Sequence, residues 1–299
     1  MYAKVILDSI SPEGDRLTTM EVRMHRFVLA EFNTHRIFSR NSASSRAIPI
    51  LKRIADVWNS LAWPVEWGSN KPGMQAGEEL TGWNLTAVKA IWKTISVLCC
   101  GAAWLMHRLG LHKQVANRVL EPFLWHTVVV TSTEWQNYFS QRCSPLAQPE
   151  IRAVSEMMKK AYDESTPWTV DTLGSRGWHL PYLTNLEQED LAMYGDTNPK
   201  LLSNLVMCSV ARCARVSYKS YAYSDKTKGM LDEIHLFIKL ATAEPPHLSP
   251  MEHVAIPFVF NETGNFKGWK QLRHMNFKAM VDKGFSSKPE DQLFLSGVK

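Results

Sequence analysis

The sequence lacks any cysteine pattern that would support a disulfide framework or a zinc ribbon. Its five cysteines are an odd number, and no two of them form a CxxC pair. Small disulfide-bonded domains and structural zinc sites both depend on such spacing. We therefore expect free thiols, no bound metal, and a reducing, cytoplasmic location.

A signal peptide and an uninterrupted membrane span are also lacking. The first residues contain no basic stretch followed by a long apolar core. The most apolar run, residues 87–106, is interrupted by Lys89 and Lys93. Because a spanning helix needs about 20 predominantly apolar residues, we expect a largely buried helix here and no membrane association. A transmembrane helix is the less favoured alternative.

Positive charge is in small excess. The net charge is +5, with 21% of residues charged, which favours an anionic ligand without identifying it. The chain of 299 residues is 45% hydrophobic, as expected for a globular protein with a substantial core. Repeats and low-complexity tails are absent. The eleven tryptophans fit either aromatic walls around a flat ligand or simply a large core.

Hydrophobic periodicity predicts both strands and helices. Residues 3–10 predict a strand that ends at a turn, and residues 17–24 alternate apolar and polar side chains, as a half-buried strand does. We expect a helix over 25–36, helical structure over 78–118 with a break near 109–112, and helix or mixed structure over 122–142. The class is therefore α+β, with a mixed or antiparallel sheet packed with long helices.

Two segments interrupt these patterns. Residues 63–77 are rich in Pro, Gly and Trp and predict a loop, and residues 166–200 look irregular, as a lid or insertion would. Further along, Val254, Ile256, Phe258 and Phe260 alternate as in a strand. We interpret residues 1–299 as a single domain with loop insertions near 63–77 and 166–200.

Hydrogen-bond donors gather in the stretch "THRIFSRNSASSRAIP", residues 34–49. It contains a histidine, three arginines, an asparagine and four serines. Arginine forks suit bidentate contact with phosphate, and serine hydroxyls can complete the shell around it. On composition alone, a solvated basic loop or a nucleic-acid-binding patch are alternative interpretations.

The order of these residues is more specific than their composition. "HRIFSRNSASSR" resembles the signature of the flavin-dependent thymidylate synthases, R-H-R-x-x-S-x-N-x-x-S-x-R, with Thr34 in place of the leading arginine. The residues that match in register are His35, Arg36, Ser39, Asn41, Ser44 and Arg46.

Two later segments are also similar to this family. "NYFSQRCSPLAQPEIR" resembles its N-x-x-x-x-R and A-Q-x-E-I-R elements, which aligns Asn137 and Arg142. "NRVLEP" resembles the family's A-R-x-x-L-P segment and makes Arg118 a candidate nucleotide contact. Taken alone, these side chains could equally be polar residues on a helix surface.

A third group of matches stands in an unexpected place. "ARCARVSY" (211–218) and "HLSPMEH" (247–253) resemble elements that precede the arginine motif in most of the family, whereas here they follow it. The order looks circularly permuted, which is feasible if the ancestral termini lay close together. For 247–253, a metal site or a core histidine beside a capping serine is an alternative. "GNFKGWKQLRHM" echoes the segment just before the family motif and points to Gln271 and Arg273, although a basic surface helix explains it equally well.

The resemblance implies a divergent, phage-type member with a defined chemistry. Such enzymes bind FAD at subunit interfaces of a homotetramer, take a methylene group from methylenetetrahydrofolate and hydride from NADPH, and convert dUMP to dTMP. Arg142 would be catalytic. The residues implied for the nucleotide are Ser44, Ser45, Arg46, Arg118, Arg142, Glu31 and Gln271. Those implied for the flavin are His35, Arg36, Ile37, Asn41, Asn137, Ser217, His247 and Ser249.

Three departures from the family pattern leave the base and product open. Thr34 removes a cation, Ser42 stands where glutamate is usual, and Glu31 replaces a glutamine that meets the nucleotide. A carboxylate near a phosphate is unfavourable unless it is neutralised. Folate-dependent hydroxymethylation or methylation of dUMP or dCMP is the alternative reaction. A nucleic-acid-binding module is a third reading, although we expect no stable nucleic-acid complex.

Overall fold

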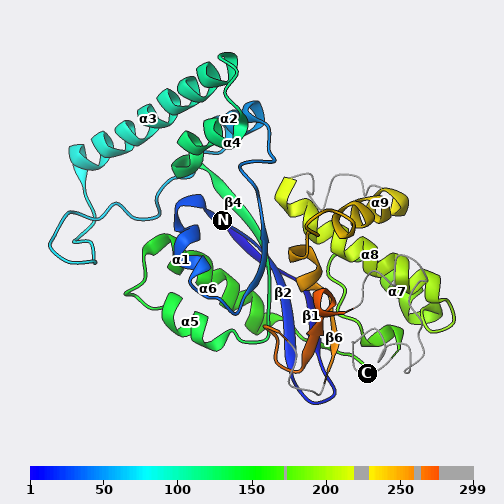
Figure 1. The fold of residues 1–299 in the computed structure, drawn as a ribbon. Helices are drawn as coiled ribbons and strands as arrows, with labels where there is room; N and C mark the ends of the chain where they lie inside the picture. The colour runs from blue at the N-terminus through cyan, green and yellow to red at the C-terminus, as the bar shows by residue number, and fades with distance from the viewer. Residues whose placement is uncertain (172–173, 219–228, 259–263, 276–299) are drawn as a thin grey trace.

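The computed structural model describes residues 1–171, 174–218, 229–258 and 264–275. A five-stranded sheet at its centre has the order β3-β4-β2-β1-β5 (Figure 1). Only β5 pairs in parallel, with β1, so the sheet is mixed and the predicted α+β class is confirmed. The strands are β1 (Tyr2–Ile10), β2 (Arg16–His25), β3 (Ser39–Ser42), β4 (Trp125–Ser132) and β5 (Trp168–Thr169).

Strand β4 makes residues 122–142 mixed and not wholly helical, which is one of the two alternatives expected. Its "TVVV" run is β-branched, which favours a strand, but it does not alternate with polar residues. Val128, Val129 and Val130 are all fully buried because both faces of β4 are covered. Such a strand has no period-2 signal that distinguishes it from a buried helix. The helical part of the segment is α5 (Gln136–Arg142).

Helices cover the two faces of the sheet (Figure 1). Val128 and Val130 pack with Tyr138 on α5 and Ile151 on α6. Val129 points to the opposite face and packs with Cys213 near the end of α8. The helices on the first side are α1 (Leu29–Asn33), α5 and α6 (Pro149–Glu164). Those on the second side are α7 (Asn185–Tyr194), α8 (Pro199–Arg215) and α9 (Met230–Ala241).

The predicted irregular segment 166–200 is more ordered than its composition indicates. It contains β5 and helix α7, which begins at a capping box formed by Thr184 and Glu187. The 63–77 segment, in contrast, contains no helix or strand, as expected. A small antiparallel sheet pairs β6 (Ala255–Pro257) with β7 (Trp269–Gln271), so the predicted strand near 254–260 is shorter than expected, and Phe260 lies outside the described residues.

Helix α3 (Gly82–Arg108) contradicts the expectation of a buried helix. It packs on α2 (Ile50–Asn59) and on the 3-10 helix η2 (Asn117–Phe123), but only Ser96, Cys100 and Ala103 of it are buried. Within the described residues it is the one helix long and apolar enough to cross a membrane, and only 11% of its most apolar window is buried. The helical structure ends after α3 and resumes as α4 (Lys113–Ala116), so the predicted break near 109–112 is confirmed.

A chain of buried polar side chains crosses the sheet. Ser9 is hydrogen bonded to His179 Nδ1 at 2.8 Å, and His179 Nε2 to Thr19 at 2.8 Å. Thr19 is bonded to Thr131 at 2.7 Å, and Thr131 to His253 Nδ1 at 2.8 Å. Burial lowers the pKa of both histidines to about 3, so both rings are neutral at physiological pH.

Because these two histidines are buried in the neutral form, we expect the free energy of unfolding to fall in mild acid. In the unfolded chain they take up protons below a pKa of about 6.5, but the folded protein resists protonation until about pH 3. Their contribution is therefore complete above pH 6.5 and falls as pH falls, by about 2 kcal/mol per histidine at pH 5. Urea unfolding at pH 7.5 and pH 5 measures this difference. His253→Gln should shrink the difference by about 2 kcal/mol; an unchanged difference would contradict the account.

Candidate active site

Strand β3 and the turns on either side of it carry the arginine motif. β3 is an edge strand that pairs antiparallel with β4, with Ser39 opposite Thr131 and Asn41 opposite Val129. Because side chains alternate along a strand, Ser39 and Asn41 are buried whereas Arg40 is half-buried. The motif is thus divided into residues that anchor it and residues that face outward.

Arg142 is held at the start of the motif by three acceptors. From the end of α5, its Nε donates to His35 Nε2 at 3.0 Å. Its Nη2 donates to the Glu31 carbonyl at 3.2 Å and to Thr34 Oγ1 at 3.0 Å. Burial lowers the pKa of His35 to about 4, helped by the charges of Arg142 and Arg40. The imidazole is therefore neutral at pH 7 and can accept the Arg142 hydrogen bond.

The Arg142 charge is not neutralised. Among the described residues no carboxylate forms an ion pair with it, and all three of its acceptors are uncharged. Thr34, which stands where the resemblance predicts an arginine, orients the guanidinium instead of repelling it. A fixed cation without a counter-ion is suited to stabilising negative charge on a bound molecule.

The late segments 211–218 and 247–253 lie directly against the motif. Asn41 Nδ2 donates to the Cys213 carbonyl at 2.9 Å, and Ser249 Oγ to Asn41 Oδ1 at 3.3 Å. The Ser44 amide donates to the Ser217 carbonyl at 2.9 Å. Segments about two hundred residues apart in sequence thus meet at β3, as a permuted order requires.

Gln271 is buried next to β3. It is 1% exposed, and its Nε2 donates to Ser39 Oγ at 2.7 Å and to the Glu252 carbonyl at 3.0 Å. Its amide donor is thus engaged internally, where it positions β3, and its predicted contact with a nucleotide stays a prediction. His247 is exposed, and its amide is bonded to the Leu240 carbonyl.

A carboxylate that the sequence reading missed sits at the other end of the motif. Glu121 Oε1 accepts hydrogen bonds from Ser45 at 2.6 Å, from Arg118 at 2.8 Å and from Arg26 at 3.2 Å. Burial would raise its pKa, but the Ser45 hydrogen bond and the two arginines outweigh burial and lower it. Glu121 is the acidic residue of "NRVLEP". Its position three residues after Arg118 was the feature of the sequence that could have indicated an ion pair here.

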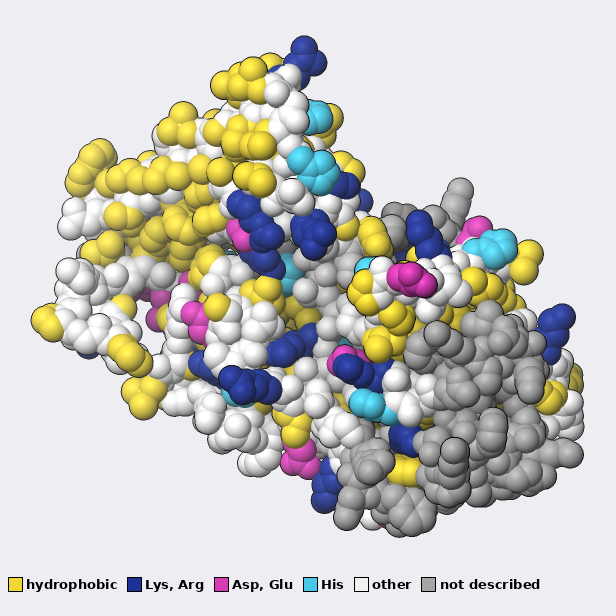
Figure 2. Space-filling view, in the orientation of Figure 1, with side chains coloured by type: hydrophobic (Ala, Val, Ile, Leu, Met, Phe, Trp, Pro, Cys, Tyr) yellow, Lys and Arg dark blue, Asp and Glu magenta, His cyan; other side chains and the backbone are white. Residues whose placement is uncertain are grey.

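Several predicted site residues remain open to solvent. Arg36, Ile37, Arg46 and Asn137 are exposed. Within the described ranges, the guanidinium groups of Arg36 and Arg46 form no hydrogen bond or ion pair. Figure 2 shows Lys and Arg side chains gathered near the centre of one face, between the α3 region and the α8–α9 region. Exposed, unpaired cations on the arginine motif are suited to an anionic ligand.

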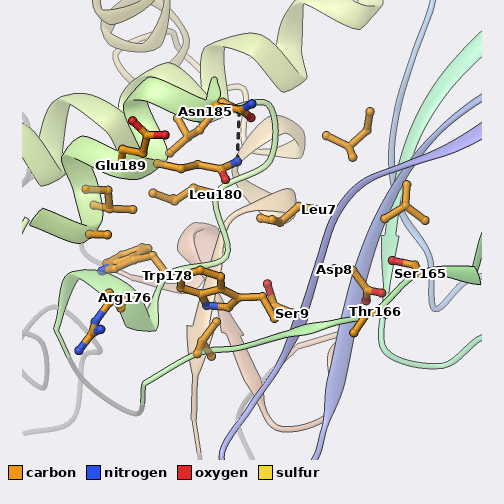
Figure 3. A pocket seen from close by; sticks show the side chains of 18 residues that line it. Leu7, Asp8, Ser9, Ser165, Thr166, Arg176, Trp178, Leu180, Asn185 and Glu189 are labelled. Atoms are coloured by element: carbon orange, nitrogen blue, oxygen red, sulfur yellow. Dashed lines mark hydrogen bonds between the residues drawn. The ribbon is translucent and has the colours of Figure 1, made fainter.

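A separate cavity lies at the opposite edge of the sheet. It has a volume of about 580 Å³ and is lined by parts of β1, β5 and α7, with Trp178 and Leu180 among its walls (Figure 3). None of the predicted site residues lines it. Two carboxylates line it, Asp8 and Glu189, and Asp8 is already bonded to Arg16 and Thr18. The cavity therefore does not belong to the arginine motif.

The fold and the site together define an α+β protein with a cationic loop suited to an anionic ligand. A family model described as thymidylate synthase complementing protein matches residues 17–168. Because this match spans just over half of the chain, the protein belongs to the thymidylate synthase complementing family and is an enzyme of the thymidylate synthase type. No curated protein matches the chain at a significant level.

The matched range covers the arginine motif and the later segment 118–152, so the family resemblance expected from both is confirmed. Segments 211–218 and 247–253 lie outside it. Their contacts with Asn41 and Ser44 support the permuted order, which remains a prediction.

Proposed function

We propose that this protein uses FAD, methylenetetrahydrofolate and NADPH to methylate dUMP at C5 and form dTMP. The observation that carries the proposal is the Arg142 guanidinium, fixed by neutral His35 and Thr34 and left without a counter-ion. C5 chemistry on a pyrimidine places negative charge on the ring carbonyls. A preorganised cation lowers the barrier to that step, because it need not reorient as the charge develops.

The nucleotide phosphate would bind at the far end of the motif. Arg46 is exposed and unpaired within the described ranges, and the half-buried Ser44 lies two residues before it. Arg118 now pairs with Glu121, but it is about half exposed, so exchanging that partner for a phosphate costs little. Charge-assisted hydrogen bonds from arginine and serine are the strong contacts that a phosphate needs.

The flavin would bind at the near end, where the chain offers fitting groups. Arg36 is an exposed, unpaired donor for an anionic cofactor within the described ranges. When bound, the flavin supplies the redox chemistry. His35, Asn41 and Ser249 would orient it.

Glu31 favours a second candidate reaction. A carboxylate can accept a hydrogen bond from the amino group of cytosine, a pairing known from base recognition. Folate-dependent methylation or hydroxymethylation of dCMP, or hydroxymethylation of dUMP, would use the same cationic site. The buried, unpartnered Oε2 is the observation that keeps this alternative open.

Titration with FAD, followed by competition between nucleotides, tests the proposal. The purified protein should bind FAD, and dUMP should perturb the flavin absorbance at lower concentrations than dCMP. Glu31→Gln should strengthen dUMP binding relative to dCMP if the carboxylate reads the base. A protein that cannot be loaded with FAD would contradict the proposal, and a preference for dCMP would favour the second reaction.

A further inference from the structure

The cavity at the β1 edge of the sheet has the size and the walls of a site for a small molecule. Its volume of about 580 Å³ falls within the range of ligand pockets, roughly 300–1,000 Å³. More than half of the residues that line it are apolar, and four of these belong to the buried core: Trp178, Leu180, Leu183 and Leu191. An apolar cavity of this size with a few polar groups is the usual form of a ligand site.

Helix α7 supplies the polar side of this cavity. Asn185, Gln188, Glu189 and Ala192 line it, and their spacing of three, four and seven residues from the first places them on one face of the helix. In Figure 3, Asn185 and Glu189 come from α7 on one side, whereas Leu7 comes from β1 on the other. Both polar side chains are exposed, so they form the rim of the cavity and not its interior.

The charged side chains that line the cavity leave one negative charge uncompensated. Asp8 is paired with Arg16 at 2.6 Å, and Arg176 is paired with Asp171 at 3.1 Å. Glu189 is the third charged residue of the lining, and no cation among the described residues forms an ion pair with it. The rim therefore attracts a cation and repels an anion.

Polar groups deeper in the cavity are already engaged within the chain. Ser9 is hydrogen bonded to His179 at 2.8 Å, and Gln188 Nε2 donates to the Leu183 carbonyl at 3.4 Å. The part of a ligand that enters the cavity thus gains by burying apolar surface and not by making hydrogen bonds. Trp178 is 5% exposed and offers a flat indole wall, which suits an aromatic ring.

We propose that this cavity binds an arylalkylamine, a molecule with a flat apolar body and one protonated amino group. The aromatic body would lie among Leu7, Trp178 and Leu180, and the ammonium group would lie at the rim beside Glu189. The amide oxygen of Asn185, one helical turn before Glu189, can accept a second hydrogen bond from the ammonium group. None of the residues predicted for the nucleotide or the flavin lines the cavity, so this site goes beyond the proposed reaction.

A matched pair of synthetic probes tests the proposal. 3-(2-Naphthyl)propylamine and 3-(2-naphthyl)propanoate share the aromatic body and differ in the sign of the charged end. Isothermal titration calorimetry of the purified protein at pH 7.5 in 150 mM NaCl should show that the amine binds about five- to tenfold more tightly than the carboxylate. Charges more than about 8 Å away are largely screened at this ionic strength, so the difference reports groups close to the ligand.

Two substitutions on α7, each with a matched control on the same helix, locate the binding site. Glu189→Gln should weaken binding of the amine about three- to fivefold, whereas Asp190→Asn, which removes a charge outside the lining, should not. Ala192→Trp should abolish binding of both probes because the indole would fill the cavity. Met193→Trp adds the same ring outside the lining and should leave binding unchanged. All four positions are exposed, so the thermal unfolding midpoints should match that of the wild type.

Three results would overturn the proposal. The first is a wild type that binds neither probe at about 1 mM, the weakest affinity expected for a ligand of this size. The second is equal affinity for the amine and the carboxylate, which would rule out recognition of a cation. The third is undiminished binding to Ala192→Trp, which would place the probe elsewhere, such as on the exposed apolar side chains of α3. A protein that cannot be loaded with FAD would contradict the proposed reaction and would not change these outcomes.

Discussion

Arg142→Ala is expected to lower kcat by about 10²–10³-fold, the loss typical when one preorganised group that stabilises transition-state charge is removed. The expectation follows from its geometry, because three uncharged acceptors orient the guanidinium without consuming its charge. Stability should change little, since the side chain is only half-buried. Steady-state kinetics and thermal unfolding of the same preparation measure both effects.

Two further variants separate charge from geometry at this position. Arg142→Lys keeps the charge but cannot reach His35 and Thr34 together, so its kcat should fall between those of the wild type and Arg142→Ala. Arg176→Ala, an exposed arginine at the cavity on the opposite edge of the sheet, is the matched control and should retain full activity. Wild-type kcat in a folded Arg142→Ala protein would refute the proposed role.

Glu233→Ala is expected to destabilise the protein by about 3–5 kcal/mol, the cost of leaving a buried charge without its partner. Arg215 Nε donates to both Glu233 carboxylate oxygens, at 2.9 and 2.8 Å, and joins the end of α8 to α9. Glu233 is 1% and Arg215 8% exposed. Urea unfolding at pH 7.5 measures the loss.

The Arg215–Glu233 pair also matters to the site. Cys213 and Ser217 flank Arg215, and their carbonyls accept from Asn41 and Ser44. Glu233→Ala should therefore weaken ligand binding even under conditions in which the variant is still folded. Glu164→Ala, which removes an exposed pair with Lys160, is the control and should leave the unfolding midpoint unchanged. An equal midpoint in Glu233→Ala would show that the buried pair contributes nothing.

Local sequence pattern predicted the first two strands. β2 was predicted because apolar and polar residues alternate along its sequence, and β1 because an apolar run ends at a turn. β4 was not, because Val128, Val129 and Val130 are buried on both faces and carry no alternation. The exposure of α3 was missed because apolar composition alone does not show whether a helix is buried within the folded chain.

Candidate site residues could be identified from the sequence where they belong to linear motifs. His35 and Arg142 were identified from two linear motifs that the structure joins by a hydrogen bond, and Asn41 is bonded to Cys213 of the late segment. Glu121 was missed because its role depends on the packing of η2 against Ser45, a contact over 76 residues of sequence. The burial of Gln271 behind β3 was not foreseen, because burial is a property of the folded chain, and its contact with a nucleotide stays a prediction.

The most direct test of the account is the mass of the nucleotide formed when the protein is incubated with FAD, NADPH, methylenetetrahydrofolate and either dUMP or dCMP. The account predicts that dUMP gains one methylene unit to become dTMP and that dCMP is returned unchanged. A hydroxymethylated product, turnover of dCMP alone, or no product from either nucleotide would contradict thymidylate synthesis by this enzyme.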